Sequence, residues 1–155
     1  MGVSMLDMAR KFAELQIEAI GTAVVTEYAI EIVDTLKYQL FEESVDGNGN
    51  TLRTPYSNIA GPVGPKGYRT LKREMRGKEI TDLYLTGEFY AAMVLTVSGG
   101  EYSITSNDSK TVDIVKWANA PIFCLSLDSK AKVYTNFIRP AMTLKIAEIT
   151  GCGIS

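Results

Sequence analysis

The chain has 155 residues, of which 46% are apolar and 22% charged, and its formal net charge is −2. These proportions are typical of one globular domain, and no apolar run reaches the length of about 18 residues that suggests a membrane span. Histidine is absent, which excludes histidine-activated nucleophiles, the usual near-neutral general base and imidazole metal ligands. The two cysteines, Cys124 and Cys152, match no metal or redox spacing. We therefore predict a single domain over residues 1–155 with no cofactor, no metal site and no membrane partner.

The net charge hides a segregation along the chain. Residues 1–50 carry three bases and nine acids, residues 51–78 seven bases and one acid, and residues 79–155 six bases and eight acids. The three parts therefore have balances of −6, +6 and −2. An acidic part and a basic part on one chain can complement each other between copies, or each can be a solvated face without a partner.

Residues 4–44 are predicted to form a long N-terminal helix. Ser4, followed three residues later by Asp7, is typical of a helix N-cap. Apolar residues at helical spacing then form two stripes, Met5, Met8, Phe12, Leu15 and Ala19, and then Val25, Ala29, Ile32, Leu36 and Leu40. The helix is weakest from Gly21 to Val25, where glycine and β-branched residues lower helix propensity. Because such a helix extends past a small core, it either bends near Gly21 or packs on another subunit, and the change of stripe favours more than one neighbour.

The stretch from Asp46 to Asn50 is similar to the start of a calcium-binding loop but lacks two of its requirements. Thr51 stands where the sharp-turn glycine is needed, and Ser57 stands where a bidentate carboxylate is needed. We therefore predict a plain turn and no metal ligand.

Residues 46–69 are predicted to form an extended loop, rich in proline and glycine, that leads into a basic segment from Arg69 to Lys78. Loops longer than about 12–15 residues are usually functional. Basic residues near tyrosines are also typical of nucleic-acid binding, but the segment contains no recognised nucleic-acid-binding motif. Non-specific contact with phosphates in a larger assembly stays open. We predict a partner interface made by Arg53, Tyr56, Lys66, Tyr68, Arg69, Lys72, Arg73 and Arg76.

A β-hairpin is predicted within residues 83–108. Apolar residues alternate from Phe89 onward, which is the period of a half-buried strand, and Gly99-Gly100 is typical of a type I′ turn. A two-residue loop fixes the register of two core-facing pairs, Val97 with Tyr102 and Leu95 with Ile104.

The last part of the chain is predicted to be mostly helical. A short helix over residues 109–118 offers Val112, Val115 and Trp117 to the core, and residues 122–125 form a buried edge strand or extended link. Ser126 begins a final helix whose buried stripe is Leu127, Ala131, Tyr134 and Ile138. Pro140 kinks this helix or begins a second segment, and Gly151 ends it. The sequence therefore predicts an α+β fold with a long N-terminal helix, a small antiparallel sheet built on a β-hairpin, and C-terminal helices.

The sequence contains no pair of residues with catalytic spacing. Glu42 and Glu43 form a carboxylate pair, but adjacent helical positions point in different directions. We therefore predict no catalytic residue and no enzymatic activity.

Several short motifs follow one another along the chain from Asp46 to Ser126. The turn Asp46-Gly47-Asn48-Gly49 is followed by Tyr56-Ser57 and by basic residues through Arg76. Then come Leu85-Thr86-Gly87-Glu88-Phe89, Ala92-Met93 and, near the C-terminus, Phe123-Cys124-Leu125-Ser126. In this order the motifs resemble the virion-morphogenesis and tail-completion proteins of the head–tail neck of tailed phages, Mu-type and related. The family commonly has serine where Ala92 stands and often glycine where Cys124 stands, so the chain departs from its pattern at both positions.

The resemblance implies an α+β structural subunit without enzymatic activity that oligomerises into a ring at the head–tail junction of the virion. It also implies partners: other copies, other neck, portal or tail proteins, and DNA nearby without specific binding. The assembly is then expected to form in the cytoplasm of the bacterial host. The alternative is a cytoplasmic protein-binding or regulatory module without catalytic activity, and the size of the purified assembly separates the two.

Overall fold

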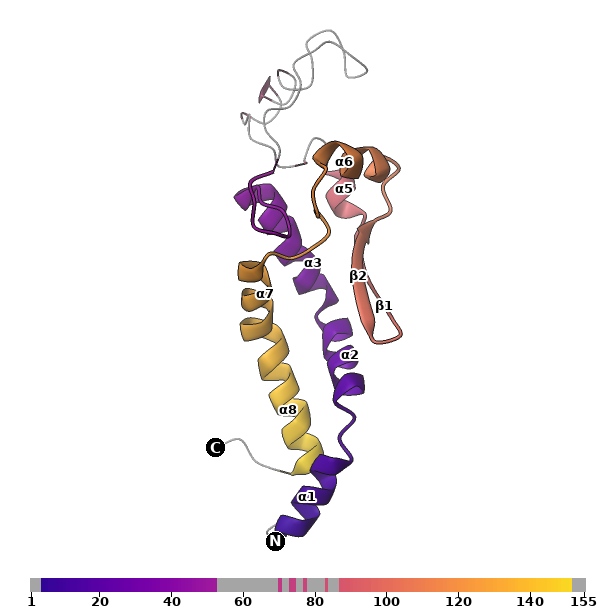
Figure 1. Ribbon diagram of the computed structural model, residues 1–155, viewed down its shortest axis with the longest axis vertical. Coiled ribbons are helices and arrows are strands. Elements are labelled where there is room, and N and C mark those ends of the chain that lie inside the picture. The colour runs from indigo at the N-terminus through magenta and orange to yellow at the C-terminus, as the bar shows by residue number, and fades with distance from the viewer. Residues whose placement is uncertain are drawn as a thin grey trace.

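The computed structural model describes residues 4–52, 70, 73, 74, 77, 83 and 87–151. Two helical arms run antiparallel along the long axis of the molecule, one built from α1, α2 and α3 and the other from α7 and α8 (Figure 1). In this view α2 and α3 stand between α8 on one side and the β1–β2 hairpin on the other, while α5 and α6 lie at one end of the hairpin. Helices with one small antiparallel sheet confirm the predicted α+β class.

The predicted N-terminal helix is divided into segments rather than continuous. They are α1 (Met5–Ala13), α2 (Ile17–Glu27), α3 (Ala29–Tyr38) and a π-helical turn, η1 (Gln39–Glu43). Ser4 caps α1 as predicted, because its hydroxyl accepts a hydrogen bond from the Asp7 amide at 3.3 Å. Of the two predicted alternatives, the bend near Gly21 does not occur, because Gly21 lies inside α2, and packing on another subunit stays a prediction. A break falls instead at Tyr28, whose ring packs 5.6 Å from that of Phe137. A tertiary contact between the arms therefore marks a break that helix propensity does not predict.

The returning arm consists of α7 (Leu127–Val133), a second π-helical turn, η2 (Tyr134–Ile138), and α8 (Arg139–Thr150). Backbone angles stay helical at Ile138 and Arg139, so Pro140 does not break the arm. Proline lacks an N–H and its ring clashes with the carbonyl four residues earlier, and the wider π turn just before Pro140 relieves both problems. Gly151 ends α8 in the left-handed conformation, as predicted.

The stripe predicted to be buried on this final helix is largely exposed. Leu127 is 81% exposed and Tyr134 is 56% exposed, Ala131 is also exposed, and Ile138 is half-buried. Ser129 and Val133 are buried instead. The reason is the N-cap: Ser126 is buried, and its hydroxyl accepts from the Ser129 amide at 3.2 Å, which turns the Ser129 side of α7 inward.

The hairpin has the predicted register. Strands β1 (Met93–Ser98) and β2 (Glu101–Ser106) pair antiparallel, with Val97 opposite Tyr102 and Leu95 opposite Ile104. Gly99 and Gly100 both have positive φ, as a type I′ turn requires. Tyr102, however, is 62% exposed near the turn, so that pair covers less of the core than predicted.

The strand begins later than the alternation from Phe89 predicted. Residues Glu88–Ala91 form a helical turn, α5, after Gly87 at φ 90°. Both Phe89 and the adjacent Tyr90 are buried, which a strand with one solvated face does not allow. The Ser106 hydroxyl donates to the Phe89 carbonyl oxygen at 2.8 Å and ties this turn to the end of β2.

Helix α6 (Thr111–Ala118) confirms the predicted short helix but buries other side chains than expected. Val112 is 76% exposed and Val115 37% exposed, whereas Trp117 packs against the core. The following residues 122–125 form a turn rather than an edge strand, although Ile122 in it is buried. The helical turn α5, the turn at residues 122–125 and helix α6 thus close the end of the molecule where α3 meets the hairpin.

The core lies where α3 faces both the hairpin and the second arm. Its larger cluster joins α3 and η1 to the hairpin end of the molecule, and its smaller cluster joins Val25 and Ile32 to Val133 of α7. The second predicted stripe is confirmed, since Leu36 and Leu40 are fully buried and Ile32 nearly so. Leu95 and Ile104 touch both clusters, so the hairpin links the core without forming its centre. No helix in the described part of the chain is both long and apolar enough to cross a bilayer.

Candidate functional site

Most of the predicted partner interface lies outside the described residues. This applies to Arg53, Tyr56, Lys66, Tyr68, Arg69, Lys72 and Arg76. Arg73 is described, and it is exposed in a helical turn. The described part of the predicted loop over residues 46–69 ends at Leu52, so an interface there stays a prediction.

Three segments that are distant in sequence meet beside η1, and the buried side chain of Gln39 joins two of them. Its Nε2 donates to the carbonyl oxygens of Val45 at 3.3 Å and Cys124 at 3.1 Å. Its Oε1 accepts from the Ser126 amide at 2.8 Å. With no exposed surface, the Gln39 amide supplies both hydrogen-bonding functions: it accepts from a buried backbone amide and donates to two part-buried carbonyl oxygens. We call this place the junction, defined by Gln39, Asp46, Gly47, Phe89, Phe123 and Cys124.

The turn after η1 forms one side of the junction. The Asp46 side chain is buried, and its Oδ1 accepts from the amides of Asn48 and Asn50, each at 2.9 Å. The carboxylate therefore organises its own turn, as Asx residues do. Among the described residues no three acidic or thiol side chains gather where they could hold a metal ion.

Gly47 brings this turn against the loop before α7. Its amide donates to the Pro121 carbonyl oxygen at 3.0 Å. A Cβ at position 47 would lie 2.4 Å from the Cys124 Cβ and 2.9 Å from the carbonyl oxygens of Cys124 and Pro121. Only glycine fits this approach without displacing backbone.

Aromatic rings bring the third segment into the junction. The ring of Phe89, in α5, lies 5.9 Å from that of Phe123. Tyr90 makes edge contacts with Phe89 at 5.6 Å and with Phe41 of η1 at 6.3 Å. The end of the first arm, the turn after it, α5 and the loop before α7 are therefore held together by packing and hydrogen bonds.

Gln39 is the functional candidate that the sequence analysis missed. The available signal is its place between Leu36 and Leu40, on the buried side of the predicted helix, where a polar side chain needs a partner. Its partners at Cys124 and Ser126 are 85 and 87 residues away along the chain, so they could not be read from local sequence.

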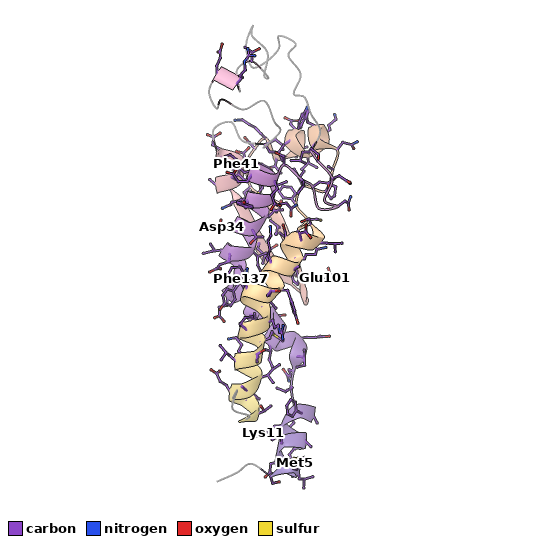
Figure 2. The ribbon with its side chains drawn as sticks, turned by 90° about the vertical axis from the view of Figure 1, so that its left-hand side faces the viewer. Met5, Lys11, Asp34, Phe41, Glu101 and Phe137 are labelled. Carbon is purple, nitrogen blue, oxygen red and sulfur yellow. The ribbon has the colours of Figure 1, made fainter. Side chains whose placement is uncertain are left out.

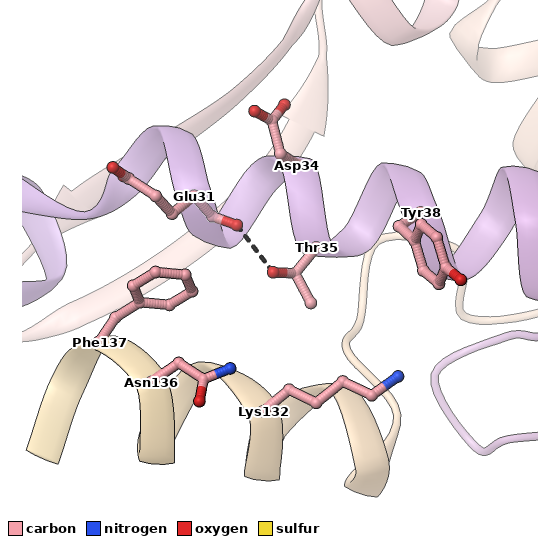
Figure 3. Close-up of a pocket in the computed structure, with 7 residues that line it drawn as sticks. All are labelled: Glu31, Asp34, Thr35, Tyr38, Lys132, Asn136 and Phe137. Atoms are coloured by element: carbon pink, nitrogen blue, oxygen red, sulfur yellow. Dashed lines mark hydrogen bonds between the residues drawn. The ribbon is translucent and has the colours of Figure 1, made fainter.

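A shallow groove of about 490 Å³ runs between α3 and the second arm. Figure 3 shows Lys132, Asn136 and Phe137 approaching from α7 and η2, opposite Thr35 and Tyr38 of α3. The Lys132 Nζ lies 2.9 Å from a Glu43 carboxylate oxygen and 5.8 Å from the centre of the Tyr38 ring. Asp34 points away from the second arm, and its carboxylate pairs with Lys37 at 3.0 Å.

The groove offers binding contacts rather than an activated nucleophile. The hydrogen bond to Glu43, reinforced by the negative charge of that carboxylate, raises the pKa of Lys132 above its ordinary value of 10.5. Lys132 is therefore an ammonium ion at neutral pH, and an ammonium ion neither attacks a carbonyl nor accepts a proton. The Thr35 hydroxyl donates to the Glu31 carbonyl oxygen at 2.8 Å, which satisfies it within α3.

The Lys132–Glu43 ion pair is expected to stabilise the fold only below strongly alkaline pH. Folding raises this pKa, so the contribution is complete below the unfolded value of 10.5 and is lost as the pH rises through the higher folded value. Thermal unfolding of the parent and of Lys132→Met should differ slightly and equally from about pH 7 to about pH 10, and the difference should shrink above that range. Lys130→Met, at an exposed lysine of the same helix, is the control. A difference from the parent that persists unchanged well above the raised pKa contradicts this assignment.

Comparison of the chain with protein-family models, with curated proteins and with solved structures gives no match in any of the three.

Proposed function

We propose that the chain is a structural subunit of the head–tail junction of a tailed-phage virion, a neck or tail-completion protein that acts by oligomerising into a ring and by contacting neighbouring virion proteins. The observation that supports this most is where the resembling motifs lie. The turn Asp46–Gly49, the Gly87–Phe89 step and the Phe123–Ser126 step are far apart in sequence. Yet all three meet within this chain, at the junction around Gln39. Motifs that occurred by chance would have no reason to share one place in the fold.

The architecture favours a scaffold over a catalyst. Gln39 and Gly47 fix the loops at the end of the first arm, and apolar side chains stay exposed along both arms. Exposed apolar surface on an elongated molecule is typical of protein–protein contact. The groove at Lys132 holds a charged amine and a threonine hydroxyl that already donates within α3, which suits contact with a partner better than chemistry.

The basic part of the chain, residues 51–78, is proposed to be the surface that docks on acidic neighbours. Its balance of +6 opposes the balance of −6 of residues 1–50, so copies arranged head to tail can bring unlike charges together. Other neck, portal or tail proteins are the remaining proposed partners, with DNA nearby and without sequence-specific binding. Such a subunit is found in the virion after assembly in the bacterial cytoplasm.

Replacing Arg69, Lys72, Arg73 and Arg76 with serine is expected to weaken assembly while the domain stays folded. Exposed charges add little to stability, whereas complementary charges between copies act over about 10 Å and are screened by salt. Sedimentation velocity at low and high salt, with negative-stain imaging, measures the effect. The matched control replaces Lys110, Lys116, Lys130 and Arg139, four bases outside the basic part.

The result separates the proposal from its alternative. Closed rings that loosen in salt and in the quadruple variant, but not in the control, support the neck-subunit proposal. The alternative, a cytoplasmic binding or regulatory module, is supported if the parent forms no rings and instead binds one soluble protein as a monomer. If rings form equally at low and high salt, and equally in the parent and the quadruple variant, the basic part is not in the interface between copies.

A further inference from the structure

Strand β2 forms an open edge of the small sheet. Among the described residues the sheet has two strands, so each strand has one edge without another strand beside it. Strand β1 packs along α3, whereas no described helix packs along β2 to a similar extent. In Figure 1 the hairpin stands at the side of the molecule with no labelled element beyond it. Figure 2 places Glu101, the first residue of β2, level with Phe137 in the middle of the long axis.

The hydrogen bonds of the hairpin show which peptide groups of β2 point outward. In an antiparallel pair, every second pair of opposite residues exchanges hydrogen bonds. One such bond lies just beyond the strands, where the Asn107 amide donates to the Ala92 carbonyl oxygen at 3.0 Å. Counting back along β2 from Asn107 in steps of two passes over Tyr102 and Ile104. The N–H and C=O groups of Tyr102 and Ile104 therefore point away from β1.

This edge carries none of the features that usually prevent pairing with another strand. Within the described chain, the peptide groups of Tyr102 and Ile104 have no hydrogen-bond partner. Edge strands of natural proteins are commonly protected by proline, by charged side chains or by a bulge. From Tyr102 to Ser106, β2 contains no proline and no charged residue, and its register with β1 has no bulge. The edge is therefore a template on which a further strand can pair.

The positions of the outward-pointing groups identify the same strand of a second copy as the occupant. When two copies of β2 lie antiparallel, Tyr102 of each can stand opposite Ile104 of the other, so that all of these peptide groups are bonded. A shift of two residues in one direction would place Tyr102 opposite Ser106, whose carbonyl oxygen already accepts from the Thr111 hydroxyl at 3.1 Å. The opposite shift would place Ile104 opposite Gly100, in the turn. One register thus satisfies both copies.

Side chains agree with this register. Tyr102, which is 62% exposed, comes beside Ile104 of the second copy on one face of the sheet, and aromatic and β-branched side chains form favourable cross-strand pairs. Glu101 is the only charged residue of β2, and it stands opposite Thr105 of the second copy rather than opposite another Glu101. Because α3 packs along β1, the helices of the two copies lie over the outer strands of the joined sheet.

We propose that the β2 strands of two copies pair edge to edge about a two-fold axis at Ser103 and join the two hairpins into one four-stranded antiparallel sheet. We call this the edge contact, defined by Tyr102, Ser103 and Ile104. It is isologous, because the same residues contribute from both copies. A contact of this size is small, so the association is weak and depends on concentration. The edge contact goes beyond the proposed neck role and involves no residue of the basic part.

Disulfide cross-linking at the axis tests the register. In a full chain that carries Cys124→Ser and Cys152→Ser, the substitution Ser103→Cys would place two thiols opposite each other. They would stand in a pair without hydrogen bonds, where the Cα atoms are about 4.5 Å apart, within the range that a disulfide spans. Glu101→Cys in the same background is the matched control, because Glu101 is exposed on the same face of β2 but lies two residues from the axis. Under mild oxidation, Ser103→Cys should form covalent pairs at least about tenfold faster than the control, as measured by non-reducing electrophoresis.

A like charge at the axis should weaken the edge contact without disturbing the hairpin. Ser103→Lys would place two ammonium groups directly opposite each other, which is destabilising. Thr96→Lys is the matched control: Thr96 is exposed on β1, and its hydroxyl lies 3.1 Å from that of Ser103, so both variants lose the same hydrogen bond. Sedimentation velocity up to about millimolar concentration should show association at least about tenfold weaker for Ser103→Lys and unchanged for Thr96→Lys. Circular dichroism checks folding.

Three results would each overturn the edge contact: a parent that stays a single chain at every concentration, Ser103→Cys that cross-links no faster than Glu101→Cys, and Ser103→Lys that associates like the parent. If Ser103→Lys does not fold, the cross-linking comparison decides. Cross-linking through Ser103→Cys should be unchanged when the four serine substitutions of the basic part are added. Rings without cross-linking at position 103 would contradict the edge contact and leave the neck-subunit proposal standing. Cross-linked pairs without rings would do the reverse.

Discussion

Gln39→Leu is expected to lower the free energy of unfolding by about 2–3 kcal/mol, since a buried hydrogen-bonding group that loses its partner costs about 1–3 kcal/mol and the two part-buried carbonyl oxygens cost less. Leucine nearly matches glutamine in volume, so the loss comes from polar groups rather than from a cavity. Three backbone groups lose their partner: the Ser126 amide and the carbonyl oxygens of Val45 and Cys124. Urea unfolding followed by circular dichroism measures the change.

Gln16→Leu is the matched control for this substitution. Gln16 is exposed, and its side chain makes no capping hydrogen bond at the start of α2. The same exchange there should change the free energy of unfolding by no more than about 0.5 kcal/mol. If Gln39→Leu were as mild as Gln16→Leu, water would have to reach the junction, and Gln39 would not be what holds its loops.

The parts of the fold that were predicted correctly depend on local chemistry. The hairpin register follows from two glycines flanked by alternating apolar residues, and both glycines have the positive φ that the turn requires. The stripe from Val25 to Leu40 is long and regular, so its burial follows from helical period alone. In both cases neighbouring residues determine the result.

The wrong predictions fall where distant contacts decide. A helix break falls at Tyr28, whose ring packs on Phe137 more than a hundred residues later. The face of α7 is set by Ser126, whose amide is held by Gln39, so the apolar stripe at Leu127 and Tyr134 faces outward. At Phe89, burial of two adjacent aromatic residues overrides an alternation that predicts a strand. The spacing of apolar residues along the sequence gives no information about any of these contacts.

The candidate site also has parts that local sequence predicts and parts that it does not. Charge and proline content predict a partner surface within residues 53–76, but only Arg73 of that predicted interface is among the described residues. The junction could be predicted only in part: the turn at Asp46 and the Phe123–Ser126 step were noticed as motifs, whereas the glutamine that joins them was not. Its role depends on three hydrogen bonds to backbone, and backbone partners leave no pattern in a sequence.

Gly47→Ala is expected to destabilise the chain by about 3 kcal/mol, near the upper end of what overpacking usually costs. The new Cβ would lie 2.4 Å from the Cys124 Cβ and 2.9 Å from two carbonyl oxygens, and backbone oxygens cannot rotate away as a flexible side chain can. Gly21→Ala is the control. It lies inside α2 with no atom within 4 Å of the new Cβ, so it should stabilise the chain by about 0.5–1 kcal/mol.

Adding Cys124→Gly to Gly47→Ala separates the two sources of this cost. Glycine at 124 removes the closest atom, the Cβ at 2.4 Å, but leaves the carbonyl oxygens of Cys124 and Pro121 at 2.9 Å. The double variant should therefore recover part of the lost stability and not all of it, after subtracting the effect of Cys124→Gly alone. Strictly additive effects would mean that the Cys124 Cβ contributes nothing to the cost and that the two carbonyl oxygens alone require glycine at position 47.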